Sequence, residues 1–191
     1  MNEAVRQMLS SYDVRSVEES LRALREIMQE IALLGLWRSK FFEKGAFYGG
    51  TALRVLYGLD RFSEDLDFTL LGKNEGFDLA DHSEALKREL ASFGFSVEIE
   101  SRVKPAGAAI QSAFLKADTR TQMITVEFDD ALIRQVNRNR VLKIRLEVDT
   151  DPPAGFTTEI RYLLRPVPFA VRTFSLPDLF AGKMHPVHCR E

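Results

Sequence analysis

Residues 61–71 read RFSEDLDFTLL, and polar and apolar side chains alternate over most of this stretch. A period of two is typical of a strand with one wet face. Because residues two apart in a strand point to the same side, Ser63, Asp65 and Asp67 are expected to project together. Leu66 and Phe68 then face the core. The stretch therefore predicts a strand that aims two carboxylates at one point.

Two neighbouring carboxylates repel each other, and a cation between them keeps both ionised. Hard oxygen ligands favour Mg²⁺ or Mn²⁺, so Asp65 and Asp67 are predicted to bind such a metal. Two alternatives stay open for Asp-x-Asp. It occurs on solvated acidic strand faces, and glycosyltransferases use it to hold a nucleotide-sugar diphosphate.

A glycine turn lies just upstream. The apolar piece 46–48 predicts a strand, Gly49-Gly50-Thr51 follows, and a helix is expected to about Tyr57, closed by Gly58. Bare backbone amides at a helix N-terminus attract phosphate oxygens, and Thr51 adds a hydroxyl. These residues are predicted to bind the phosphates of a nucleotide. The alternative is a tight turn in which Thr51 only caps the helix.

A third acidic candidate lies in residues 141–149, VLKIRLEVD, where alternation is again nearly unbroken. The even-numbered residues from Leu142 to Val148 are apolar, and the opposite face carries Lys143, Arg145, Glu147 and Asp149. Asp149 is predicted to complete a metal-binding carboxylate triad in a cleft. The alternative is a solvated outer face with cross-strand ion pairs.

The remaining patterns predict an α+β fold, a mixed sheet flanked by helices. Ser16 and Glu19 have capping-box spacing and begin an expected amphipathic helix over 16–37, which packs on the core or receives a partner. A helix is expected over 79–93, and extended segments near 95–101, 111–117 and 122–129. Prolines after Asp151 predict a loop-rich crossing, followed by a helix near 178–185. The expected parts are an N-terminal helical segment (1–44), a catalytic core (45–175) and the start of a C-terminal helical region (176–191).

Composition excludes several classes of protein. The 191 residues are 45% hydrophobic and carry a net charge of -2, so no global positive field indicates nucleic-acid binding, and any RNA contact must use a local patch. Cys189 has no partner for an internal disulfide, which fits a reducing cytoplasm. No targeting or membrane-spanning segment is expected.

Taken together, residues 49–53 (GGTAL) and 61–68 (RFSEDLDF) resemble the AbiEii/AbiGii toxin family of nucleotidyltransferases. The resemblance extends to residues 143–153 and 176–185. It implies a polymerase-β-like core with Asp65 and Asp67 as the catalytic metal-binding pair, Asp149 as the third acid and Lys183 as a catalytic or nucleotide-contacting lysine. Thr51 corresponds to the hydroxyl of the glycine turn. Arg61, Ser63 and Lys143 lie in the matching motifs and are assigned to the nucleotide-binding surface with Gly49 and Gly50.

The resemblance also implies a function. Members act as toxins of bacterial toxin–antitoxin or phage-defence systems, and some modify tRNA, so the expected substrates are an NTP and an acceptor such as tRNA, with Mg²⁺ as cofactor and a cognate antitoxin as partner. Pro186 is expected to interrupt the last helix, and the chain stops at Glu191, before the family's distal Arg-Asp motif. A truncated chain is therefore expected. The alternative function is a catalytically degenerate module that binds a nucleotide or antitoxin.

Overall fold

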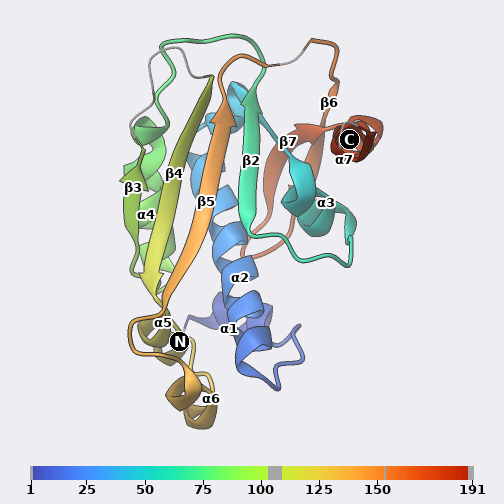
Figure 1. Ribbon diagram of the computed structural model, residues 1–191. Coiled ribbons are helices and arrows are strands. Elements are labelled where there is room, and N and C mark those ends of the chain that lie inside the picture. The colour runs from blue at the N-terminus through green and yellow to red at the C-terminus, as the bar shows by residue number, and fades with distance from the viewer. Residues whose placement is uncertain (1, 103–108, 153, 189–191) are drawn as a thin grey trace.

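A seven-stranded mixed sheet forms the centre of the computed structural model, which describes residues 2–102, 109–152 and 154–188, with side chains up to Gly182 (Figure 1). The sheet order is β3-β4-β5-β2-β1-β7-β6. The pairs β2/β5 and β1/β7 are parallel, and the other neighbouring pairs are antiparallel. The strands are β1 (Gly45–Tyr48), β2 (Asp65–Leu70), β3 (Glu98–Ser101), β4 (Ile110–Asp118), β5 (Val141–Asp149), β6 (Thr158–Leu163) and β7 (Phe169–Phe174). The predicted α+β class is confirmed.

Helices flank this sheet. They are α1 (Glu3–Leu9), α2 (Val17–Arg38), α3 (Gly49–Tyr57), α4 (Ser83–Ser92), α5 (Thr119–Thr125), α6 (Asp130–Gln135) and α7 (Leu176–His188), with 3-10 turns at Phe41–Glu43 and Leu79–His82. In Figure 1, α2 and α4 lie behind β4, β5 and β2, and none of the labelled helices lies in front of these strands. One face of the central strands therefore packs on helices, and the other is open within the described part of the chain.

The long helix α2 begins as its sequence predicts and packs on the core. The Ser16 hydroxyl accepts a hydrogen bond from the Glu19 amide at 3.2 Å, and the Glu19 carboxylate accepts one from the Arg15 amide at 2.9 Å. Leu24, Ile27 and Ile31 are fully buried. The predicted amphipathic helix is confirmed, and its apolar stripe is covered by the protein itself rather than by a partner.

Strand β2 is anchored through aromatic contacts on its inner side. The Phe68 ring lies 5.1 Å from the Phe41 ring and 5.2 Å from the Phe47 ring, measured between centroids. Leu66 is fully buried on the same face. The strand begins only at Asp65, so residues 61–64 of the predicted strand lie outside it.

The predicted extended segment 122–129 is wrong, because its first part is helix α5. The Asp118 carboxylate caps this helix by accepting a hydrogen bond from the Thr121 amide at 2.7 Å. Gln122, Met123 and Val126 are buried, a spacing that fits a helix side. The cap at Asp118 thus favours a helix in this segment, although its composition is typical of a strand.

The predicted loop-rich crossing after Asp151 is also wrong in its second half, where β6 and β7 form an antiparallel pair from Thr158↔Phe174 to Leu163↔Phe169. Pro166 and Pro168 lie in the connection between the two strands and interrupt neither.

Two smaller differences concern the ends of the described chain. Helix α1 was not predicted, and α7 runs through Pro186 to His188, which contradicts the expected interruption there. Among the described residues, no helix combines the length and apolar character needed to cross a membrane.

Candidate active site

Strand β2 carries the predicted pair of carboxylates on the side away from the core. Asp65 and Asp67 are half-buried, whereas Leu66 and Phe68 between and beside them are buried at 0% and 1% exposure. The alternation of the strand therefore places both carboxylates on one face, as the sequence predicts. Because Leu66 and Phe68 face the side that the helices cover, the two carboxylates lie on the opposite face of the sheet.

Strand β5 adds a charged row beside this pair. In the parallel register, Asp65 lies opposite Arg145 and Asp67 lies opposite Glu147. The Arg145 guanidinium donates to Asp65 Oδ2 at 2.7 Å and lies 3.1 Å from Glu147 Oε1. The hydrogen bond to Asp65 raises the pKa of Arg145 above its usual value. The cross-strand ion pair that was the alternative for this row is thus present, next to the predicted site.

The third acid has two candidates. Asp149, the residue predicted from the sequence, lies opposite Thr69, and its Oδ1 accepts a hydrogen bond from the Asp151 amide at 3.0 Å. Glu147 lies directly opposite Asp67. Sequence reasoning placed Glu147 on the charged row and missed it as a site residue, because only the strand register shows which acid faces Asp67.

The hydroxyl of Tyr48 lies close enough to these acids for their charges to affect its pKa. Burial, followed by the negative charges of Asp67, Asp149 and Glu147, raises the pKa of the Tyr48 hydroxyl to about 12. Tyr48 lies opposite Asp67 at the end of β1. As arranged here, no group of three or more acidic, histidine or cysteine side chains within the described residues is positioned to hold a metal ion together. The metal hypothesis therefore rests on Asp65 and Asp67.

The glycine turn packs directly against the second carboxylate. Gly49 has a φ of +83°, a left-handed conformation that favours glycine. A Cβ atom at this position would lie 2.5 Å from Asp67 Oδ2, closer than real Cβ atoms approach. Gly49 and Gly50 form the first turn of α3. The sequence motif therefore brings the start of a helix and a carboxylate of the candidate site together.

Thr51 makes a contact within the protein that the sequence does not predict. It is 1% exposed, and its hydroxyl donates to the backbone carbonyl of Asp65. The residue that precedes α3 is Tyr48, which makes no side-chain capping bond. The Thr51 hydroxyl therefore joins α3 to the first residue of β2 instead of capping the helix, and its contact with a nucleotide phosphate stays a prediction.

The other predicted nucleotide-binding residues lie on several different segments. Arg61 and Ser63 belong to the segment before β2, so Ser63 does not share the strand face with the aspartates. The Lys143 ammonium lies 3.7 Å from the centroid of the Phe114 ring. Lys183 is on α7, and its side chain lies outside the described residues.

An aromatic stack beside Asp67 was not found from the sequence. The Tyr48 ring stacks on Phe174 with centroids 5.1 Å apart, and Phe174 stacks on Phe156 at 4.5 Å. These rings come from β1, from β7 and from the segment before β6, so no local sequence pattern joins them. A parallel pairing between β1 and β7 creates the stack.

A similar fold is found in solved structures of longer proteins. The crystal structure of JHP933 from Helicobacter pylori matches with a TM-score of 0.50 and 16% identity, over 84% of this chain and 54% of that one. A second H. pylori protein, provisionally assigned as a nucleotidyltransferase, matches with a TM-score of 0.47 and 17% identity, over 84% of this chain and 56% of that one. The chain thus spans about half the length of both.

Comparison with curated proteins gave no match. The family model described as nucleotidyl transferase AbiEii toxin, type IV toxin–antitoxin system, matches residues 31–191. This match includes β2 with its carboxylates, the glycine turn and β5. The chain therefore belongs to the AbiEii nucleotidyltransferase toxin family.

Proposed function

We propose that this chain is a metal-dependent nucleotidyltransferase that moves a nucleotide from an NTP to an acceptor hydroxyl. One observation carries the proposal. The Asp67 carboxylate lies against Gly49 at the start of α3, which supports a site where carboxylates that bind a metal stand beside amides that bind phosphate.

The donor atoms fit Mg²⁺ or Mn²⁺. Asp65 and Asp67 offer hard carboxylate oxygens on one strand face, and both residues are partly exposed to solvent. Arg145 engages Asp65 through Oδ2, so the guanidinium neutralises part of the negative charge of the row. Asp65 and Asp67 would hold the ion, which when bound supplies positive charge to the phosphate oxygens.

The chain's own groups suggest how the transfer proceeds. Amides in the first turn of α3 bind the triphosphate, and the missing side chain at Gly49 lets the Asp67 carboxylate lie against this turn. The acceptor oxygen attacks the α-phosphorus in line, the bond to the leaving pyrophosphate breaks, and the hydroxyl proton passes to Asp149 or Glu147. From the family resemblance, Lys183 is expected to supply positive charge to the triphosphate, and Arg61, Ser63 and Lys143 are expected to contact the nucleotide.

The wider role follows from the family. We propose tRNA or another RNA as the acceptor and a cognate antitoxin as the partner, in the cytoplasm of a bacterium. The division into residues 1–44, 45–175 and 176–191 remains part of this proposal. The competing function is a module of the same fold that binds a nucleotide or an antitoxin without chemistry.

Label transfer from α-labelled NTPs to total tRNA tests the proposal. Asp65→Asn and Asp67→Asn remove charge while keeping side-chain shape, and both are expected to abolish Mg²⁺-dependent labelling. Asp13→Asn changes an exposed aspartate paired with Arg15 and is the matched control. Undiminished transfer in both site variants would exclude the metal assignment.

Two further outcomes separate the alternatives. NTP binding without any labelling by the unaltered chain would favour the degenerate binding module. Transfer from nucleotide-sugars and not from NTPs would favour a glycosyltransferase.

A further inference from the structure

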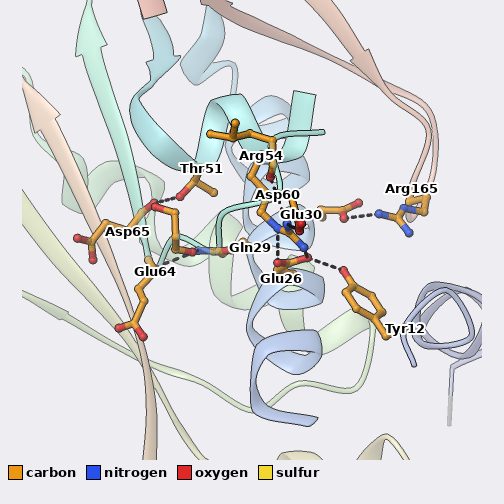
Figure 2. A network of polar contacts seen from close by, with 12 residues as sticks. Tyr12, Glu26, Gln29, Glu30, Thr51, Arg54, Asp60, Glu64, Asp65 and Arg165 are labelled. Carbon is orange, nitrogen blue, oxygen red and sulfur yellow. Dashed lines mark hydrogen bonds and ion pairs between the residues drawn. The ribbon is translucent and has the colours of Figure 1, made fainter. Parts of the chain in front are cut away.

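The backbone just before Asp65 is held by a side chain from α2. The Gln29 amide, fully buried, donates to the Ser63 carbonyl at 3.1 Å and to the Glu64 carbonyl at 3.0 Å (Figure 2). Its Oε1 has no hydrogen-bond partner among the described residues. Reversing the amide would bring Oε1 against two carbonyl oxygens, so both amide protons are committed to this backbone.

The next carbonyl is held from α3. The Thr51 hydroxyl donates to the Asp65 carbonyl, as Figure 2 shows beside the Gln29 contacts. The parallel ladder between β2 and β5 begins only at the pair Asp65↔Arg145. Side chains from two helices therefore fix three consecutive carbonyls at the point where the strand that carries the carboxylates begins.

The two helices are themselves joined by an ion pair. The Arg54 guanidinium of α3 lies 2.5 Å from Glu26 Oε1 of α2 and also donates to the Leu59 carbonyl at 3.2 Å. The Glu26 carboxylate also accepts a hydrogen bond from the Tyr12 hydroxyl at 3.0 Å. Figure 2 shows this network running from Tyr12 to the segment before Asp65.

A second contact from α2 reaches the same segment. The Arg25 guanidinium pairs with Glu64 at 2.7 Å and lies 5.4 Å from the centroid of the Phe62 ring. Phe62 and Glu64 are therefore both contacted by the helix that supplies Gln29. The segment between α3 and β2 rests on α2 instead of on a neighbouring strand.

We propose that Gln29 is a positioning residue of the metal site, whose amide sets the backbone from which the Asp65 carboxylate projects. The inference rests on the proposed function, because it concerns the metal that Asp65 and Asp67 would hold. Gln29 lies outside residues 31–191, which the family model matches. The N-terminal part of α2 thus contributes to the proposed site by holding its backbone in place.

Direct Mn²⁺ binding, measured by electron paramagnetic resonance on the whole chain, tests this without requiring turnover. Gln29→Met keeps a buried side chain of similar length and removes the two donors. Because outer partners of metal ligands typically contribute 10–100-fold to metal affinity, we expect the dissociation constant to rise by about tenfold or more.

Gln122 supplies a matched control. It is 1% exposed, and it lies on α5, where its amide bridges the backbone of Ser96 by donating at 3.1 Å and accepting at 3.3 Å. Gln122→Met removes an equally buried glutamine and is expected to bind Mn²⁺ as the unaltered chain does. Gln29→Asn, too short to reach both carbonyls, replaces Gln29→Met if that variant does not fold.

The outcomes separate the two proposals. If Asp67→Asn loses Mn²⁺ while the Gln29 variants bind as tightly as the unaltered chain, Gln29 has no positioning role. An equal loss in Gln122→Met would likewise overturn it, because general destabilisation would then explain the effect. If the unaltered chain binds no Mn²⁺, or Asp67→Asn binds it equally well, the metal site itself is refuted.

Discussion

Replacing Gly49 with alanine would disturb the backbone and the Asp67 carboxylate together, and a second glycine allows the two effects to be separated. Gly49 has a φ of +83°, and Gly58, at the other end of α3, has a φ of +72°. A Cβ atom at Gly58 meets nothing within 4 Å, whereas one at Gly49 lies 2.5 Å from Asp67 Oδ2. Gly58→Ala therefore carries the backbone cost alone.

The backbone cost is similar at both positions. An L-residue in the left-handed region costs roughly 1–2 kcal/mol, and alanine recovers part of this by restricting the unfolded chain. Both variants are expected to lose about 1 kcal/mol of unfolding free energy, measured by urea denaturation. Equal losses would show that the Asp67 contact is relieved by movement of the carboxylate instead of by unfolding.

That movement is the predicted functional effect. Real Cβ atoms essentially never approach closer than 3.0 Å, so the Asp67 oxygen must retreat by at least about 0.5 Å. Misplacement by roughly 1 Å can cost about 100-fold in a positioned site, so a tenfold weaker Mn²⁺ affinity is expected for Gly49→Ala, or about 1.4 kcal/mol.

The assay compares Mn²⁺ dissociation constants of the two alanine variants at matched stability. Gly58→Ala is expected to bind as the unaltered chain does. If Gly49→Ala and Gly58→Ala bind Mn²⁺ equally, the argument that the glycine leaves room for the Asp67 carboxylate fails.

Three further predictions concern charge and packing. Burial raises the pKa of Glu30 from 4.5 to about 7, so this group's contribution to stability is greatest below pH 4.5 and is lost as pH rises through 7. In the unaltered chain this group should lower the free energy of unfolding by about 3 kcal/mol or less between pH 5 and 8, and Glu30→Gln should remove that decline. If the urea midpoint depends on pH in the same way in both proteins, the prediction fails. Arg145→Met removes a cation next to Asp65 and Glu147, so Mn²⁺ should bind more tightly, and weaker binding would show that the guanidinium orients the carboxylate more than it competes with the metal. Phe68→Ala deletes a buried ring that packs on Phe41 and Phe47 and should cost about 3–5 kcal/mol by urea denaturation, whereas a loss under about 1 kcal/mol would mean that the site collapses without a cavity.

The strand-based predictions succeeded where the residue period was long and regular. The alternation of residues 141–149 matches the burial of β5, with Leu142, Ile144 and Val148 buried and the charged residues on the other face. The predicted helix over 79–93 appears as a 3-10 turn followed by α4. Local chemistry suffices in such cases because the same face is buried at every repeat.

Short segments failed because their conformation depends on distant partners or on a cap. The segment 122–129 has strand-like composition, yet Asp118 caps a helix whose buried Gln122 binds the backbone of Ser96. Strands β6 and β7 are defined by their pairing with each other and by the pairing of β7 with β1, which the sequence pattern does not show. The prolines between these strands predict a loop, and they carry no information about how the flanking strands pair.

The sequence by itself determined the pair Asp65 and Asp67, their common face and the glycine turn upstream, because strand alternation and turn chemistry are local. Only the tertiary structure decided the surroundings of the pair. The parallel register of β5 placed Arg145 opposite Asp65 and Glu147 opposite Asp67, and the packing of α2 placed Gln29 under the backbone that leads to them. These contacts join residues about 35 to 80 positions apart, and such contacts are fixed by how sheets and helices pack and not by any local pattern.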